Sequence, residues 1–264
     1  MKYRIIALDI DGTLLNDQYE VTEATIRSIE RIHRAGTQIV LCTGRSPENS
    51  IPIMNKLGLE GVLITHNGAV TVQTPGFQVL HQFSFPIGKV EPLIRFCREQ
   101  EVHFDVNDAE HLYVERAGEE EAAMYEKYMV RPVVTADVLQ LRQPMVKLTV
   151  FGSEERMDEV ERQWLESGLP EGLVMIRSGV HFIDVMLEGV SKGTALEKLA
   201  EQLQVGREAI LAMGNYYNDI DMIEFAGLGV AMDNSPDAVK EAADLVAPSN
   251  NEDGVSRILQ DFCV

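Results

Sequence analysis

The chain has 264 residues, 45% of them hydrophobic, and a formal net charge of -19. That much apolar material can bury one sizeable core and a smaller second one, but no apolar run approaches the roughly 20 residues of a membrane span. The negative charge argues against nucleic acid and anionic membranes as partners, because proteins that bind them present a basic surface.

The first predicted element is a buried strand over residues 3–8 that leads into Asp9 and Asp11. Two carboxylates so close repel each other unless a cation such as Mg²⁺ lies between them. Carboxylates are known nucleophiles at phosphorus, so Asp9 is a candidate to form an aspartyl-phosphate. Asp11 would protonate the leaving oxygen and later deprotonate water. The simpler alternative is an Asp-Gly turn after a strand.

A helix is predicted over residues 23–35, capped by Thr22, and a second strand over 38–42. This strand ends in Thr43-Gly44-Arg45. Thr43 can donate to a phosphoryl oxygen, whereas Arg45 could reach either an anionic group of a substrate or a neighbouring carboxylate. A single threonine at a strand end is often only structural.

The next helix starts at Ser46-Pro47, and Pro52 is expected to kink or delay it. A third strand covers residues 62–65, and a β-ribbon follows at 69–72 and 79–83. Asn67 lies between them and either faces the site or simply belongs to an Asn-Gly turn.

From residue 83 to residue 186 the pattern changes. Helices predicted at 90–100 and 157–167 alternate with short strands near 103–106, 112–114, 147–151, 174–176 and 182–185. None of them ends in a cluster of polar residues that suggests catalysis. We predict an α/β protein with a doubly wound parallel-sheet core, residues 1–82 and 187–264, and an inserted α+β domain, residues 83–186, that acts as a lid.

Two polar segments mark the return to the core. Lys192 lies at the start of an amphipathic helix, where a cation is electrostatically unfavourable. It is either a solvated surface lysine or a lysine held against phosphate and carboxylates. Further on, a strand from residue 210 runs into Asn215-Tyr216-Tyr217-Asn218-Asp219.

Together, Asp-x-Asp-Gly-Thr, Thr-Gly-Arg, Lys-Gly-Thr and Gly-Asn-x-x-Asn-Asp resemble the haloacid dehalogenase superfamily, specifically Cof-type phosphatases with a large C2-type cap. The resemblance extends over nearly the whole chain. It implies Asp9 as nucleophile and Asp11 as general acid and base. The implied phosphate- or substrate-binding residues are Thr43, Gly44, Arg45, Lys192 and Asn218, with Lys192 also screening Asp9. The implied Mg²⁺ ligands are Asp9, Asp11 (main-chain carbonyl), Asn215 and, directly or through water, Asp219.

One position departs from the pattern of that family, which typically has aspartate where this chain has Asn215. An amide oxygen can coordinate Mg²⁺ but adds no charge, so weaker metal binding or slower turnover is expected. We predict a Mg²⁺-dependent phosphatase acting on a small phosphorylated metabolite such as a sugar phosphate. The alternatives are a phosphomutase, and a phosphometabolite-binding protein with little turnover.

The three cysteines, Cys42, Cys97 and Cys263, fit neither a disulfide framework nor a paired metal site, which favours a cytoplasmic location. The chain also begins without the basic segment of a secretory signal. Cys42 is next to Thr43, but alternation along a strand directs its side chain to the core.

Overall fold

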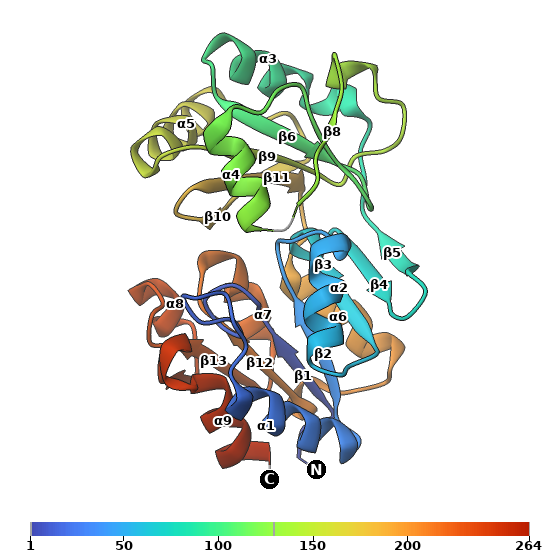
Figure 1. Ribbon diagram of the computed structural model, residues 1–264, viewed down its shortest axis with the longest axis vertical. Helices are drawn as coiled ribbons and strands as arrows, with labels where there is room; N and C mark the ends of the chain where they lie inside the picture. The colour runs from blue at the N-terminus through green and yellow to red at the C-terminus, as the bar shows by residue number, and fades with distance from the viewer. Residues whose placement is uncertain (1, 129, 264) are drawn as a thin grey trace. The chain divides into compact units, whose positions relative to one another are not determined.

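The computed structural model describes residues 2–128 and 130–263, which form two compact units (Figure 1). The core unit contains the chain up to Arg45, Ser50–His81 and the chain from Ser191 onward. The inserted unit contains Gln82–Val190 together with Ser46–Asn49. The long segment of the inserted unit therefore ends four residues later than the predicted boundary at residue 186. That it acts as a cap stays a prediction.

The core unit is built on one sheet with the strand order β14-β13-β12-β1-β2-β3-β4-β5. The strands from β14 to β3 pair in parallel, and β4 pairs antiparallel to β3. This arrangement confirms the predicted α/β fold class. The strand bounds are β1 Ile5–Leu8, β2 Gln38–Cys42, β3 Val62–Thr65, β4 Val70–Gln73, β5 Gln78–Gln82, β12 Ile210–Gly214, β13 Leu228–Met232 and β14 Leu245–Ala247.

Successive side chains of a strand point to opposite faces of the sheet. Helices cover the apolar side chains that the strands of the core unit present in this way. Leu196 and Leu199 of α6 pack in one cluster with Ile5 and Ala7 of β1. Helices α1 and α9 lie side by side (Figure 1), where Ser28 and Ser256 share a hydrogen bond of 2.8 Å. The helices are α1 Glu23–Arg34, α2 Pro47–Lys56, α6 Lys192–Gln202, α7 Ile220–Phe225, α8 Asp237–Glu241 and α9 Gly254–Cys263.

The start of α2 differs from expectation. The helix begins at Pro47 and continues through Pro52, so Pro52 does not delay it. Pro47 fits the first position, where the backbone N–H group has no partner within the helix. Pro52 is the sixth residue of the helix, so it costs one backbone hydrogen bond within the helix.

Strand β1 occupies the point where the winding of the sheet reverses. From β1 the chain proceeds through β2 to β3 on one side, whereas β12, β13 and β14 extend the sheet on the other side. In open α/β sheets the loops at the carboxyl ends of the strands separate at such a point and leave room for a ligand. The loops after β1, β2 and β12 therefore form the expected location of a site.

The inserted unit has a second sheet, with the order β10-β11-β9-β6-β7-β8. Neighbouring strands are antiparallel except for the parallel pair β7 and β8. Helices α3 Glu91–Glu99 and α5 Glu154–Ser167 contribute Ile94 and Trp164 to the apolar cluster on one face. The strand bounds are β6 His103–Asn107, β7 Leu112–Val114, β8 Val133–Val134, β9 Lys147–Phe151, β10 Leu173–Gly179 and β11 Phe182–Leu187.

The sequence prediction missed one helix of the inserted unit, α4, Glu119–Lys127. Only Tyr125 of this helix is buried, so it lacks the repeating apolar stripe that identifies an amphipathic helix.

Among the described residues, no helix is both long and apolar enough to cross a lipid bilayer.

Candidate active site

Asp9 follows β1 directly and is held by backbone pairing as a continuation of that strand. Its N–H donates to the carbonyl of Met213, which lies in β12, at 3.0 Å. Its carboxylate is 7% exposed. The sheet thus fixes a nearly buried carboxylate at the reversal point, where a charge is costly unless it is paired.

Lys192 supplies that pairing. Its ammonium donates to Asp9 Oδ1 at 2.7 Å and to Asp219 Oδ1 at 2.6 Å, and its side chain has no exposed surface. Burial lowers the pKa of Lys192, but the two carboxylates outweigh this and raise it. Of the two interpretations of the sequence, the structure excludes the solvated surface lysine.

The start of α6 is locked in place by a capping box and by close backbone contact. Ser191 Oγ accepts from the N–H of Thr194 at 3.1 Å, and Thr194 Oγ1 accepts from the N–H of Ser191 at 2.9 Å. Gly68, with a φ of +99°, packs so tightly that a Cβ would overlap the Ser191 carbonyl. This packing delivers the Lys192 side chain to the carboxylates despite the unfavourable helix end.

Asp219 organises the loop that follows β12. Its Oδ2 accepts the backbone N–H groups of Asn215 at 2.9 Å and Tyr216 at 3.0 Å, while its Oδ1 accepts from Lys192. Both oxygens of this fully buried carboxylate are therefore engaged by protein donors. This geometry favours Asp219 as an anchor of the loop and of Lys192 over direct contact with a metal.

Arg45 pairs with Asp11. Its guanidinium donates at 2.7 Å to Asp11 Oδ2 and at 2.6 Å to Oδ1, a bidentate arrangement that fixes the carboxylate plane. The Asp11 side chain is 36% exposed, in contrast to Asp9. Of the two partners left open for Arg45, the structure shows the neighbouring carboxylate.

Thr43 and Gly44 directly follow β2 and lie close to Asn67, a residue that the sequence identified only weakly. Thr43 is buried, and its Oγ1 accepts from the N–H of Arg45 at 3.1 Å. A Cβ on Gly44 would lie 2.9 Å from Asn67 Oδ1. The glycine thus leaves room for Asn67, which is also buried.

Asn67 connects two loops of the site. Its N–H donates to the Thr43 carbonyl at 2.9 Å, and its Oδ1 accepts from Asn218 Nδ2 at 2.9 Å. Its φ of 54° is in the left-handed region, which asparagine tolerates. The Asn-Gly pair after a buried strand was the available signal, but it equally predicts an ordinary turn.

The buried charges perturb the ionisation of the site. Burial, followed by Asp219, raises the pKa of Asp9 to about 7, although Lys192 acts to lower it. A divalent cation beside Asp9 would favour its ionised form. Burial also raises the pKa of the Cys42 thiol, so that this core cysteine is no thiolate nucleophile.

The side chain of Asn215 lies where a metal ligand is expected. One atom of its carboxamide is 3.1 Å from Asp9 Oδ2, 2.8 Å from the Asp11 carbonyl oxygen and 3.1 Å from Thr13 Oγ1. When that atom is the oxygen, three oxygens from Asp9, Asp11 and Asn215 crowd together. Neighbouring ligands around octahedral Mg²⁺, at about 2.1 Å from the ion, are separated by about 3 Å. This donor set therefore fits Mg²⁺.

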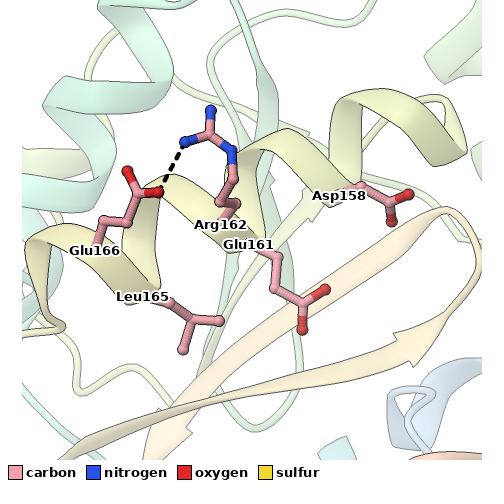
Figure 2. Close-up of a pocket in the computed structure, with 5 residues that line it drawn as sticks. All are labelled: Asp158, Glu161, Arg162, Leu165 and Glu166. Atoms are coloured by element: carbon pink, nitrogen blue, oxygen red, sulfur yellow. Dashed lines mark hydrogen bonds and ion pairs between the residues drawn. The ribbon is translucent and has the colours of Figure 1, made fainter.

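In the described residues, this site included, no group of three or more His, Cys, Asp and Glu side chains is arranged to hold a metal ion; the donor set at Asn215 instead combines one carboxylate with a main-chain carbonyl and a side-chain amide. A pocket of about 420 Å³ lies on the exposed surface of α5 in the inserted unit. It is lined by Asp158, Glu161, Arg162, Leu165 and Glu166 (Figure 2). Three acidic residues against one arginine repel an anionic substrate, and none of the predicted site residues lines this pocket.

Known proteins resemble this chain along nearly its full length. The family model of haloacid dehalogenase-like hydrolases matches residues 6–259. A Bacillus subtilis protein described as a putative phosphatase is 31% identical, over 98% of both chains. A 5-amino-6-(5-phospho-D-ribitylamino)uracil phosphatase from the same organism is 29% identical, over 98% of this chain and 97% of its own. The crystal structure of a haloacid dehalogenase-like hydrolase from Bacteroides thetaiotaomicron superposes with a TM-score of 0.86 at 28% identity, covering 99% of this chain and all of that one.

Proposed function

The chain belongs to the haloacid dehalogenase-like hydrolases, as a Cof-type phosphatase, and on this premise we propose that it hydrolyses a small phosphorylated metabolite through an aspartyl-phosphate on Asp9. The observation that carries the proposal is the placement of Asp9. A nearly buried carboxylate lies at the reversal point of the sheet, oriented by Lys192 on one oxygen. Such a carboxylate is preorganised to attack phosphorus.

The reaction proceeds in two steps that use Asp11 in both directions. In the first, an Asp9 oxygen bonds to phosphorus, the bond from phosphorus to the leaving oxygen breaks, and Asp11 gives that oxygen its proton. In the second, water attacks the phosphorus of the Asp9 acyl phosphate while Asp11 takes its proton. Phosphate leaves and the Asp9 carboxylate is restored. Arg45 sets the plane of the Asp11 carboxylate between these steps.

The phosphoryl group would be held by donors that surround Asp9. Two N–H groups of the Lys192 ammonium already point to carboxylates, which leaves the third for a phosphoryl oxygen. The hydroxyl of Thr43, the backbone at Gly44 and the amide of Asn218 would supply further donors, and Arg45 would add positive charge. Donors fixed in this way stabilise charge that develops in the transition state.

Mg²⁺ is the cofactor that the donor set accommodates. Asp9, the carbonyl of Asp11 and the oxygen of Asn215 would hold it, with Asp219 anchoring the loop that carries Asn215. When bound, the ion neutralises phosphoryl charge as a Lewis acid.

The substrate class is proposed from the name of a relative. The ribitylamino-uracil phosphatase acts, by its name, on a phosphate carried by a ribityl group. We therefore take sugar and sugar-alcohol phosphates as the first candidates. The inserted unit, predicted at residues 83–186, is proposed to act as the cap that selects among them.

A screen of phosphorylated metabolites with Mg²⁺ tests this function, with Asp9→Asn as the matched inactive control. We expect phosphate release from at least one sugar phosphate in water, without an activating bisphosphate, and none from the variant. Transfer to a second sugar hydroxyl that depends on a bisphosphate would identify a phosphomutase. Binding without turnover in Mg²⁺, Mn²⁺ and Co²⁺ would identify a binding protein.

A further inference from the structure

The carboxamide of Asn215 faces only oxygen atoms on one side. The atom in question lies within 3.1 Å of Asp9 Oδ2, the Asp11 carbonyl oxygen and Thr13 Oγ1. Two of these, the carboxylate and the carbonyl, can only accept hydrogen bonds. An amide oxygen among them needs a cation, whereas an amide nitrogen can donate to them directly.

We propose that Asn215 works in two orientations: its amino group bridges Asp9 and the Asp11 carbonyl when the metal is absent, and its oxygen takes the same position as a ligand when the metal is bound. This inference rests on the proposed function and deepens it, because it concerns regulation of the same site by the cation.

The surroundings of Asn215 permit this exchange. The two carboxamide ends are nearly equal in size, so rotation by half a turn swaps nitrogen and oxygen without displacing neighbours. The same rotation turns the amino group toward the side where the carboxamide meets only hydrogen-bond donors, a cost that coordination of the metal has to offset. The backbone N–H of Asn215 stays fixed to Asp219 Oδ2 at 2.9 Å. Gly12, with a φ of +80°, leaves the space against which the other carboxamide atom packs, since a Cβ there would overlap it.

Charge explains why an amide and not a carboxylate suits the metal-free state. Asp9 Oδ1 and Asp219 Oδ1 already share the single ammonium of Lys192. An aspartate at position 215 would bring a further carboxylate to Asp9 Oδ2 with no donor between them, and like charges in a buried site repel strongly. The Asn215 amino group instead gives Asp9 Oδ2 a donor and joins the loop after β1 to the loop after β12. The metal-free site therefore stays assembled.

The side-chain amide resonances of Asn215 test the inference in the unmodified protein. They are assigned as the pair of signals missing from the Asn215→Asp spectrum. In EDTA we expect these protons to exchange with solvent more slowly than those of the exposed Asn55, and Mg²⁺ should shift them and speed their exchange. Exchange in EDTA as fast as that of Asn55, or signals unmoved by saturating Mg²⁺, would overturn the proposal.

Stability and metal affinity provide the second readout. In EDTA, Asn215→Asp should lower Tm by about 2–8 °C, and saturating Mg²⁺ should abolish the deficit by mass action. Its Mg²⁺ affinity by calorimetry should rise by roughly tenfold or more, because a carboxylate adds ligand charge. Asn16→Asp is the control for added charge, because the Asn16 oxygen accepts two backbone N–H groups that a carboxylate would also accept.

Asn215→Ala keeps the proposal falsifiable if the aspartate variant fails to fold. It should be destabilised in EDTA and, unlike Asn215→Asp, recover little with Mg²⁺, because it lacks both donor and ligand. Parent-like stability of either variant in EDTA would refute the bridge. None of these measurements uses a substrate, so an inactive protein with the expected amide behaviour would refute only the proposed function.

Discussion

Replacing Lys192 by methionine tests whether its ammonium holds the core site together. The substitution keeps an unbranched apolar chain, one atom shorter, and removes the charge between Asp9 and Asp219, whose side chains are 7% and 1% exposed. Removing one partner of a buried ion pair typically costs about 3–5 kcal/mol, because the remaining charge stays buried without compensation. Against a typical total of about 5–15 kcal/mol, this is a large loss.

The assay is urea unfolding in EDTA, followed by circular dichroism. Lys240→Met is the matched control, since Lys240 pairs at 3.2 Å with an Asp233 side chain that is 65% exposed, and surface pairs contribute about 0–1 kcal/mol. Trp164 is the only tryptophan and lies in the inserted unit, so its fluorescence follows that unit separately. A loss for Lys192→Met below about 1 kcal/mol, similar to that of the control, would refute the bridging role.

Three further predictions concern other parts of the structure. Arg45→Lys keeps the charge but cannot form the bidentate pair with Asp11, so kcat should fall roughly tenfold or more with little change in KM. An unchanged kcat would show that Arg45 does not position Asp11. Gly68→Ala should lower Tm and phosphatase activity, because its Cβ would overlap the Ser191 carbonyl. The control is Gly58→Ala: Gly58 also has a positive φ, but its Cβ would meet nothing within 4 Å, so this variant should show only the backbone cost. Equal losses in the two variants would exclude the overlap. Burial raises the pKa of Asp105 to about 7, so the folded state binds this proton more tightly than the unfolded state, and the stabilisation is present at low pH and lost as pH rises from about 4 to 7. Asp105→Asn should therefore gain on the order of 2–4 kcal/mol relative to the parent between pH 4 and pH 8, and parallel stability–pH curves would contradict this.

The parallel core could be predicted because its signals are local. Buried strands read as continuous apolar runs, and those at residues 38–42 and 62–65 match β2 and β3 residue for residue. The missed helix α4 has a mostly polar surface, and its place is decided by tertiary contacts such as that of Tyr125 with His103, at 2.6 Å. Helix formation without an apolar stripe leaves little trace in sequence.

The sequence placed the predicted site residues at one edge of the sheet, but it did not determine which carboxylate Arg45 contacts. Parallel strands place their carboxyl ends at one edge, so Asp9 and Asn215 were expected near each other. Which carboxylate each cation would contact depends on the packing of α6 and on the turn after β2, and sequence spacing does not determine either. The pairing of Arg45 with Asp11 therefore required the structure.

The most direct test of the account is to isolate the phosphorylated enzyme. The protein is mixed with Mg²⁺ and a sugar phosphate that it hydrolyses, and the reaction is quenched in acid within milliseconds. The protein is then digested and its peptides are mapped by mass spectrometry. We predict one phosphoryl group on the peptide that carries Asp9, formed at least as fast as the steady-state turnover and absent in Asp9→Asn. Rapid turnover with no phosphoryl group on that peptide, or with the group on another residue, would contradict the central claim.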